Sequence, residues 1–239
     1  MTGSFTDIWV YLAADPLLAL TMTLAAYLAG SWLYGRAGMN PFLNPVLLAV
    51  AMIAAVLLVT GTPYETYFDG AQFVHFLLGP ATVALAIPLY RQFDRIRRSA
   101  LAIAASIVTG SVTAAVSAVG IAALLGASPL TLASIAPKSV TAPVAMAVSE
   151  ELGGAASLTA VLVILTGILG AMLGPPVLGL LGIRDAAAQG LALGTASHGI
   201  GTARAVQVSE VAGAFAGLAM GLNALATAIL LPLLWRWLA

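Results

Sequence analysis

Two stretches of this chain share a pattern that decides the fold. Residues 136–154 read APKSVTAPVAMAVSEELGG, and residues 196–214 read ASHGIGTARAVQVSEVAGA. Aligned without gaps at an offset of 60 residues, they share six identities over nineteen positions, and Lys138 aligns with His198. Each stretch has an apolar half, a short run of Pro, Gly, Ser or Thr, and a second half ending in Ser-Glu. We interpret the pair as an internal repeat of interrupted helices.

The composition around these stretches is that of a membrane protein. Of 239 residues, 61% are hydrophobic and 8% are charged, whereas a soluble domain of this size carries about 25% charged residues. The charges are clustered, and most of the charge-free runs between them reach the roughly 20 residues that a helix needs to cross a bilayer. The lipid bilayer is therefore an expected partner, whereas a soluble catalytic domain or a nucleic-acid partner is excluded.

We predict an all-α polytopic membrane protein, with residues 1–239 in a single membrane domain of about six full spans. Long continuous apolar runs favour helices over barrel strands, which would alternate polar and apolar residues. Prolines at Gly79-Pro80 and Pro88 should interrupt the third span, and Gly174-Pro175-Pro176 should interrupt the fifth. The expected full spans are 16–35, 42–60, 70–90, 100–125, 155–181 and 213–236, and the broken or re-entrant segments are 129–152 and 187–212.

The orientation follows from the densest basic cluster, Arg91, Arg95, Arg97 and Arg98, which the positive-inside rule assigns to the cytoplasm. The direction of the two broken segments stays open. If both cross the membrane, they run in the same direction. If both are re-entrant hairpins, they are inverted, and only then is Arg184 cytoplasmic.

The broken segments predict a binding site near mid-membrane. A helix that breaks inside the membrane exposes backbone groups, which must face protein or a water-filled cavity. Repeated, interrupted helices are the sequence pattern of a transporter's binding site. Half-helices are expected to begin near Thr141–Pro143 and near Gly201–Ala203, and a helix N-terminus attracts an anion. Together with nearby basic side chains this suits a carboxylate, and the predicted substrate-binding residues are Lys138, Ser139, Thr141, His198, Gly199, Gly201, Thr202 and Arg204.

Several of these residues have alternative roles. Lys138 could snorkel to the interface, and Arg204 could pair with Glu210 instead of the carboxylate of the substrate. His198 could donate to the substrate, relay a coupling proton or satisfy a backbone carbonyl. Glu150 and Glu210 are further coupling candidates, or they mark the membrane edge. Asn223, polar within the last span, could bond across helices.

Enzymatic and cofactor-dependent functions have no support in the residues. The chain has no cysteine, and it contains neither a G-x-x-x-x-G-K-[ST] phosphate loop nor an H-E-x-x-H zinc motif. No nucleophile, base and orienting group recur together. We therefore expect no enzyme, no cofactor and no metal site.

Three longer motifs carry a family resemblance: FLLGPATVALA at 76–86 followed by PLY at 88–90, KSVTAP at 138–143, and SHGIGTAR at 197–204. Together they resemble the LrgB/CidB family of bacterial inner-membrane proteins, over roughly residues 20 to 235. The resemblance implies an inner-membrane location. It also implies one of two roles: the larger partner of an LrgA-like protein in a holin-like or antiholin-like pair that controls murein hydrolase export and cell lysis, or a carrier of small carboxylates, as in the plastid glycolate/glycerate translocator.

The expected function is carriage of a small monocarboxylate, such as pyruvate, lactate, glycolate or glycerate, by alternating access, with proton coupling through His198 or a glutamate as an option. The alternative is the holin-like or antiholin-like role in murein hydrolase export and cell lysis. The residues leave open whether an LrgA-like partner is required. The run Gly213, Gly217, Gly221 would permit a homodimer.

Overall fold

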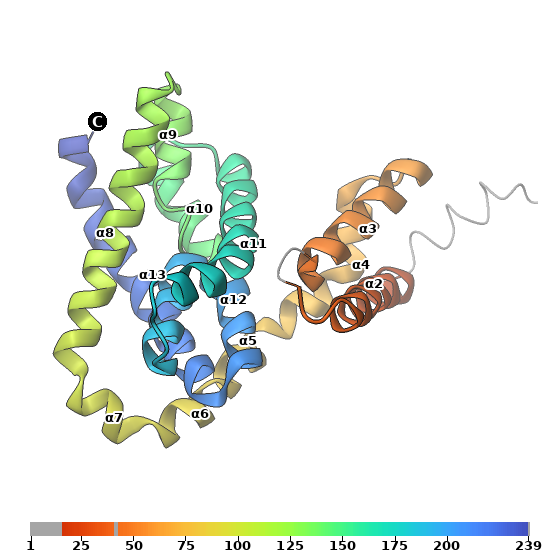
Figure 1. The fold of residues 1–239 in the computed structure, drawn as a ribbon. Helices are drawn as coiled ribbons and strands as arrows, with labels where there is room; N and C mark the ends of the chain where they lie inside the picture. Colours follow the sequence, from red (N-terminus) through yellow and green to blue (C-terminus); the bar gives the residue numbers. More distant parts are fainter. Residues whose placement is uncertain (1–15, 41–42, 239) are drawn as a thin grey trace, which may run out of the picture. The chain divides into compact units, whose positions relative to one another are not determined.

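The computed structural model describes residues 16–40 and 43–238, and every regular element in these ranges is a helix. The helices group into two compact units, one up to Ala84 and one from Leu85 onwards. The single domain expected over residues 1–239 stays a prediction. In the first unit α2 packs against α3 and α4 (Figure 1). Thr23 Oγ1 of α2 lies 2.8 Å from the Tyr67 hydroxyl of α4. Its helices are α2 (Pro16–Arg36), α3 (Pro45–Thr60), α4 (Tyr64–Phe76) and α5 (Leu78–Ala84).

The second unit contains both repeated stretches. Two short helices at one end lead into the long helix α8, and two interrupted segments alternate with the long helices α11 and α13. Its helices are α6 (Ala86–Arg91), α7 (Phe93–Arg98), α8 (Ala100–Leu124), α9 (Pro129–Ile135), α10 (Ala142–Glu151), α11 (Ala156–Leu180), α12 (Ala186–Val208) and α13 (Glu210–Leu238).

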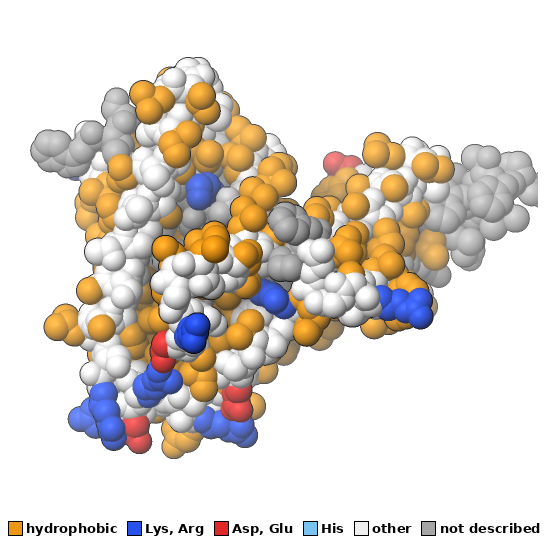
Figure 2. Space-filling model, in the orientation of Figure 1, with side chains coloured by type: hydrophobic (Ala, Val, Ile, Leu, Met, Phe, Trp, Pro, Cys, Tyr) orange, Lys and Arg blue, Asp and Glu red, His pale blue; other side chains and the backbone are white. Residues whose placement is uncertain are grey.

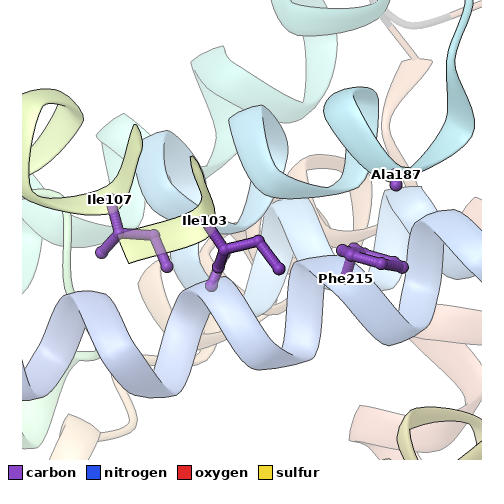
Figure 3. Packing of buried hydrophobic residues seen from close by; sticks show 5 residues of the cluster. Ile103, Ile107, Ala187 and Phe215 are labelled. Atoms are coloured by element: carbon purple, nitrogen blue, oxygen red, sulfur yellow. The ribbon is translucent and has the colours of Figure 1, made fainter. Parts of the chain in front are cut away.

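Helices α8 and α13 lie against each other and run in the same direction. Ile103 and Phe215 belong to one buried cluster, and further along both helices Ser111 Oγ lies 3.0 Å from Thr227 Oγ1. Figure 3 shows Ile103 and Ile107 on the side of α8 that faces α13. Since α8 begins just after the arginines of α6 and α7, both helices lead from this end, the Arg end, to the opposite end of the unit.

Helices α9 and α10 form a hairpin, which we call the first hairpin. Along α10, Ala145 packs with Val163 and Ser149 Oγ lies 2.7 Å from Thr159 Oγ1, so α10 runs antiparallel to α11. The α9 side runs parallel to α11, because Thr159 Oγ1 also donates to the Ser134 carbonyl and Val140, after the end of α9, packs with Val163. The chain thus enters from the end opposite the Arg end, turns at residues 136–141 and returns.

The segment 186–208, the second hairpin, turns in the opposite sense. Its first limb runs parallel to α13, because Gly190 lies against Ala212 and Gly194 against Ala216. After Ser197 and His198, which have non-helical backbone angles, the second limb runs antiparallel to α13: Thr202 lies near Met220, and Val206 near Gly213. This hairpin starts and finishes at the Arg end. Of the two topologies left open by the sequence, the contacts support the inverted hairpins, with Arg184 at the Arg end.

The fold class is confirmed as all-helical over the described residues, whereas the exact number of spans and the internal repeat are not confirmed. Among the described residues, four helices have the length and hydropathy of a membrane span: α2, α8, α11 and α13. Helix α3 is apolar but has only 16 residues. Large apolar side chains such as Leu58, Leu101 and Leu124 are more than 80% exposed, as lipid-facing side chains are. A total of six full spans stays a prediction.

The prolines act differently in the two spans where interruptions were expected. A proline ring clashes with the carbonyl four residues before it. Those residues are Phe76 for Pro80 and Ala84 for Pro88, and they are the last residues of α4 and α5. The expected span 70–90 is therefore divided. By contrast, α11 is a single helix from Ala156 to Leu180 with Pro175 and Pro176 inside it, so the chain does not break there, and a kink at these prolines stays a prediction.

Candidate functional site

The two hairpin tips are connected by a single side chain, Asn223 of α13. It is 1% exposed. Its Nδ2 atom donates to the carbonyl of Ser139 in the first tip (3.2 Å) and to that of Thr195 just before the second tip (2.9 Å). Because carbonyls can only accept, both acceptors require the nitrogen of the amide, and its orientation is determined. The expectation that Asn223 bonds across helices is confirmed, and the two interruptions meet.

Helix α11 contacts the second tip in a reciprocal way. The Nε2–H of His198 donates to the carbonyl of Val163 over 2.9 Å. Val163 and Asn223 are 60 residues apart, the same offset as the two matching stretches. Helix α11, which follows the first hairpin, therefore bonds the tip of the second, and α13, which follows the second hairpin, bonds the tip of the first.

Thr159, one turn before Val163 on α11, anchors the first hairpin. Its hydroxyl lies 2.7 Å from Ser149 Oγ on α10 and 3.1 Å from the carbonyl of Ser134 on α9. All three residues are fully buried. Ser134 Oγ in turn accepts the backbone N–H of Ala155 (2.9 Å). These bonds fix both limbs of the first hairpin to α11.

Glycines of α11 make room for the second tip. A Cβ atom on Gly170 would clash with Ser197 Oγ, and one on Gly167 would lie 2.7 Å from His198 Cε1. The tip therefore packs directly on the backbone of α11, which small residues permit.

The second tip turns at His198, whose φ of +41° and ψ of −132° are outside the helical region. A positive φ is strained for a residue with a Cβ, and such strain persists only where the surrounding structure holds it. The new half-helix thus begins at Gly199, so the predicted start near Gly201–Ala203 was wrong by a few residues. Gly201 instead lets the two limbs approach, since a Cβ there would lie 2.6 Å from that of Ser197.

The first tip matches its prediction more closely. Helix α10 begins at Ala142 with Thr141 as its N-cap residue and Pro143 in the first turn, although the Thr141 hydroxyl makes no cap hydrogen bond. Lys138 is half-buried, and its ammonium donates to Ser139 Oγ over 3.3 Å. Asn223 thus joins two tips of which one carries Lys138 and the other carries His198.

Two further predicted residues lie at the second tip. Thr202 is buried, and its hydroxyl donates to the carbonyl of His198 (2.8 Å), so it stabilises the backbone of the turn. Gly199 is exposed, and its nearest neighbour, Met220 Sδ, would lie 3.9 Å from an added Cβ. Gly199 therefore leaves space at the tip.

The three remaining candidates lie away from the tips. Arg204 follows His198 by about 9 Å of helix, and it donates to Gln207 Oε1, further from the tip (3.1 Å). Glu210 begins α13 and pairs with Arg91 over 2.8 Å. Glu150 is exposed in the last turn of α10. The positions of both glutamates favour the alternative that they mark the membrane edge.

Two buried polar atoms at the tips have no hydrogen-bond partner among the described residues: Asn223 Oδ1 and Ser197 Oγ. Such atoms call for an explanation, and an unseen ligand or water is a common one. Neither Asn223 nor Ser197 was predicted as a site residue. An amide inside an apolar span was a usable signal for Asn223. Thr159 and Ser197 are hydroxyl residues among many, and nothing in their spacing distinguished them.

Arginines bind both ends of the second hairpin. Arg91 pairs with Glu210 after the hairpin, and Arg95 pairs with Asp185 before it (2.7 Å). The backbone N–H of Ala188 and the Arg95 guanidinium hold the pKa of Asp185 below its ordinary value. Figure 2 shows Lys and Arg side chains gathered at the lower end of the second unit, where α6 and α7 lie in Figure 1.

Comparison with known proteins identifies the family. The model of the LrgB-like family matches residues 23–237. The protein YxaC of Bacillus subtilis is 39% identical over 92% of this chain and 96% of its own length. Holin-like protein CidB of Staphylococcus epidermidis is 35% identical over 91% and 94%, and that of Staphylococcus aureus is 36% identical over 82% and 85%. No solved structure matches the chain. A family model that covers nearly the whole chain, with relatives similar over most of their length, means that this protein belongs to the LrgB-like family.

Proposed function

We propose that this protein is a membrane carrier for small monocarboxylates, which bind where the two hairpin tips meet. The observation that carries the proposal is the Asn223 amide, which bonds the backbone of both tips at once. A cell membrane protein with two opposed hairpins that meet at a buried polar centre has the architecture of a carrier, whose site must be reached from either side in turn.

The chemistry of the tips suits a carboxylate. The Lys138 ammonium supplies a positive charge, and at membrane depth a charge is costly unless it has a function or a partner. The N-terminus of α10, which starts at Ala142 without a side-chain cap bond, adds backbone N–H groups. The Ser197 hydroxyl is a further donor. The acid could be pyruvate, lactate, glycolate or glycerate, and proton coupling would use His198.

Alternating access follows from an inverted repeat, which we also propose. The first hairpin with α11 corresponds to the second hairpin with α13, in the opposite orientation. Movement of one hairpin would open the site to one side of the bacterial inner membrane, and movement of the other would open it to the other side. The Arg end would face the cytoplasm.

The second candidate is a holin-like function in export of murein hydrolases and cell lysis. The names of the relatives support this candidate better than a carrier, because several are called holin-like protein CidB. This role would include an LrgA-like membrane partner, whereas a carrier could act alone or as a homodimer.

Reconstitution of the purified chain in liposomes tests the two candidates. We expect saturable uptake of radiolabelled pyruvate or glycolate, with competition by close analogues. Lys138→Ala should reduce uptake at least about tenfold, since one charged hydrogen bond is worth roughly 1.5–3 kcal/mol. Arg236→Ala, a matched loss of an exposed charge in the last turn of α13 at the opposite end of the unit, should retain uptake. Release of trapped solutes by size without chemical selectivity would reject the carrier and support the holin-like function.

A further inference from the structure

A cavity of about 340 Å³ lies between α8 and the first limb of the second hairpin. On α8 it is lined by Ser106, Gly110 and Ala114, and on α12 by residues from Ala188 to Ala196. Its volume is within the range of small-molecule pockets, about 300–1,000 Å³. Apart from Leu191 the lining residues have small side chains, and two of them, Ser106 and Thr195, carry hydroxyl groups.

The cavity extends along the hairpin from its base to its tip. Ala188, in the first turn of α12, donates its N–H to Asp185 Oδ1, and Asp185 forms the ion pair with Arg95. About 10 Å further along the helix, Thr195 bonds to Asn223 through its carbonyl. One end of the cavity thus adjoins the arginines, and the other adjoins the proposed binding site.

A second, smaller cavity adjoins the first tip. The cavity there has a volume of about 10 Å³ and lies among Ser111, Thr227 and Ser139, which is about enough for one water molecule. Ala114 lines both cavities. The wide cavity therefore leads from the Arg end toward the second tip, and the small cavity adjoins the first tip.

We propose that the wide cavity is the aqueous route by which a small anion passes between the Arg end and the hairpin tips. This inference rests on the proposed carrier function. The arginines of α6 and α7 raise the local concentration of anions at the mouth of the route, and the Arg95–Asp185 pair stands beside that mouth. The small side chains leave the width that the anion needs, and the two hydroxyl groups replace part of its hydration.

Thiol labelling tests the route without knowledge of the substrate, and the natural chain provides a cysteine-free background. Single-cysteine variants Ala114→Cys and Ala192→Cys have their new side chains in the cavity. Val116→Cys and Val108→Cys are matched controls on α8, because these valines are over 40% exposed and do not line the cavity. The probe is an anionic methanethiosulfonate, applied from the Arg end in vesicles of known orientation.

We expect the two cavity thiols to react at least about tenfold faster than the two controls, because the reactive thiolate forms in water and not in lipid. Equal, slow reaction of all four variants would overturn the route and indicate a space filled by a lipid chain or a second protein. Labelling of the denatured variants verifies that every thiol can react.

A bulky side chain gives a second measurement. Ala192→Trp should lower carboxylate uptake at least about tenfold by filling the route, whereas Val108→Trp should retain it. Unchanged uptake by a folded Ala192→Trp protein would also overturn the route. The failures are distinguishable: slow labelling of the cavity thiols with intact uptake rejects the route alone, and fast labelling without uptake of any carboxylate supports the route and rejects the proposed substrate.

Discussion

Asn223 shows how a single residue determines the relation between two elements. Replacement by leucine removes both N–H donors and leaves the carbonyls of Ser139 and Thr195 buried without that partner. Loss of buried hydrogen bonds costs about 1–3 kcal/mol for each group left unsatisfied. We therefore expect Asn223→Leu to lower the free energy of unfolding in detergent by about 2–4 kcal/mol. Thr109→Val, which removes only a bond to the backbone of its own helix, should change it by less than about 0.5 kcal/mol. Equal effects would contradict the connecting role.

His198 combines a side-chain bond with a strained backbone, and two substitutions separate them. Both His198→Ala and His198→Gly lose the bond to Val163, but only glycine accepts a φ of +41° without strain. The glycine variant should therefore be more stable than the alanine variant by about 1 kcal/mol. Thermal unfolding of both variants measures this difference. An alanine variant as stable as the glycine variant would mean that the tip has another conformation.

At the scale of the element, the start of α12 depends on Asp185, which is both its N-cap residue and the partner of Arg95. Asp185→Ala should destabilise the protein by about 1 kcal/mol through loss of the cap. Asp185→Asn keeps a capping oxygen and loses only an exposed ion pair, which is worth less than about 1 kcal/mol. Comparison of unfolding curves for the two variants measures the cap directly.

The same residue gives a pH prediction. The pKa of Asp185 is lowered in the folded protein, so its contribution to stability is complete above the ordinary pKa of aspartate, about 3.9, and is lost as the pH falls through the lower folded value. Between about pH 5 and 8 the stability difference between the natural protein and Asp185→Asn should stay constant. A difference that disappears within this range would show that the carboxylate titrates near neutrality.

The sequence predicted the position of one hairpin turn well, the position of the other less well, and the direction of neither hairpin. The interruption at Thr141–Pro143 was predictable, because a cap residue followed by proline starts a helix. The second interruption was misplaced, because the turn occurs at a histidine with positive φ, whereas glycines were expected to provide it. The direction of both hairpins was not predictable. It depends on contacts between different helices, such as that between Thr159 of α11 and Ser149 of α10, and the hydropathy of one segment carries no information about such contacts.

At the scale of the whole molecule, the hairpin topology fixes which loops share a side of the membrane. In cells, membrane-impermeant thiol reagents should label Arg184→Cys from the same side as Arg97→Cys, and Leu125→Cys from the opposite side. Segments that crossed the membrane would instead bring position 184 to the side of position 125. Arg97→Cys and Leu125→Cys act as the internal references, since α8 separates them.

The shared amide has a consequence for leakage. One nitrogen carries only two hydrogens, and each is committed to a different hairpin. In the proposed carrier, withdrawal of one hairpin would leave a single carbonyl without its amide donor, while the other hairpin would still seal its side. Simultaneous withdrawal of both would leave two such groups, so a continuous pore is the least stable arrangement. If the protein is the proposed carrier, its two hairpins would thus open in turn and the ion gradients of the membrane would stay intact.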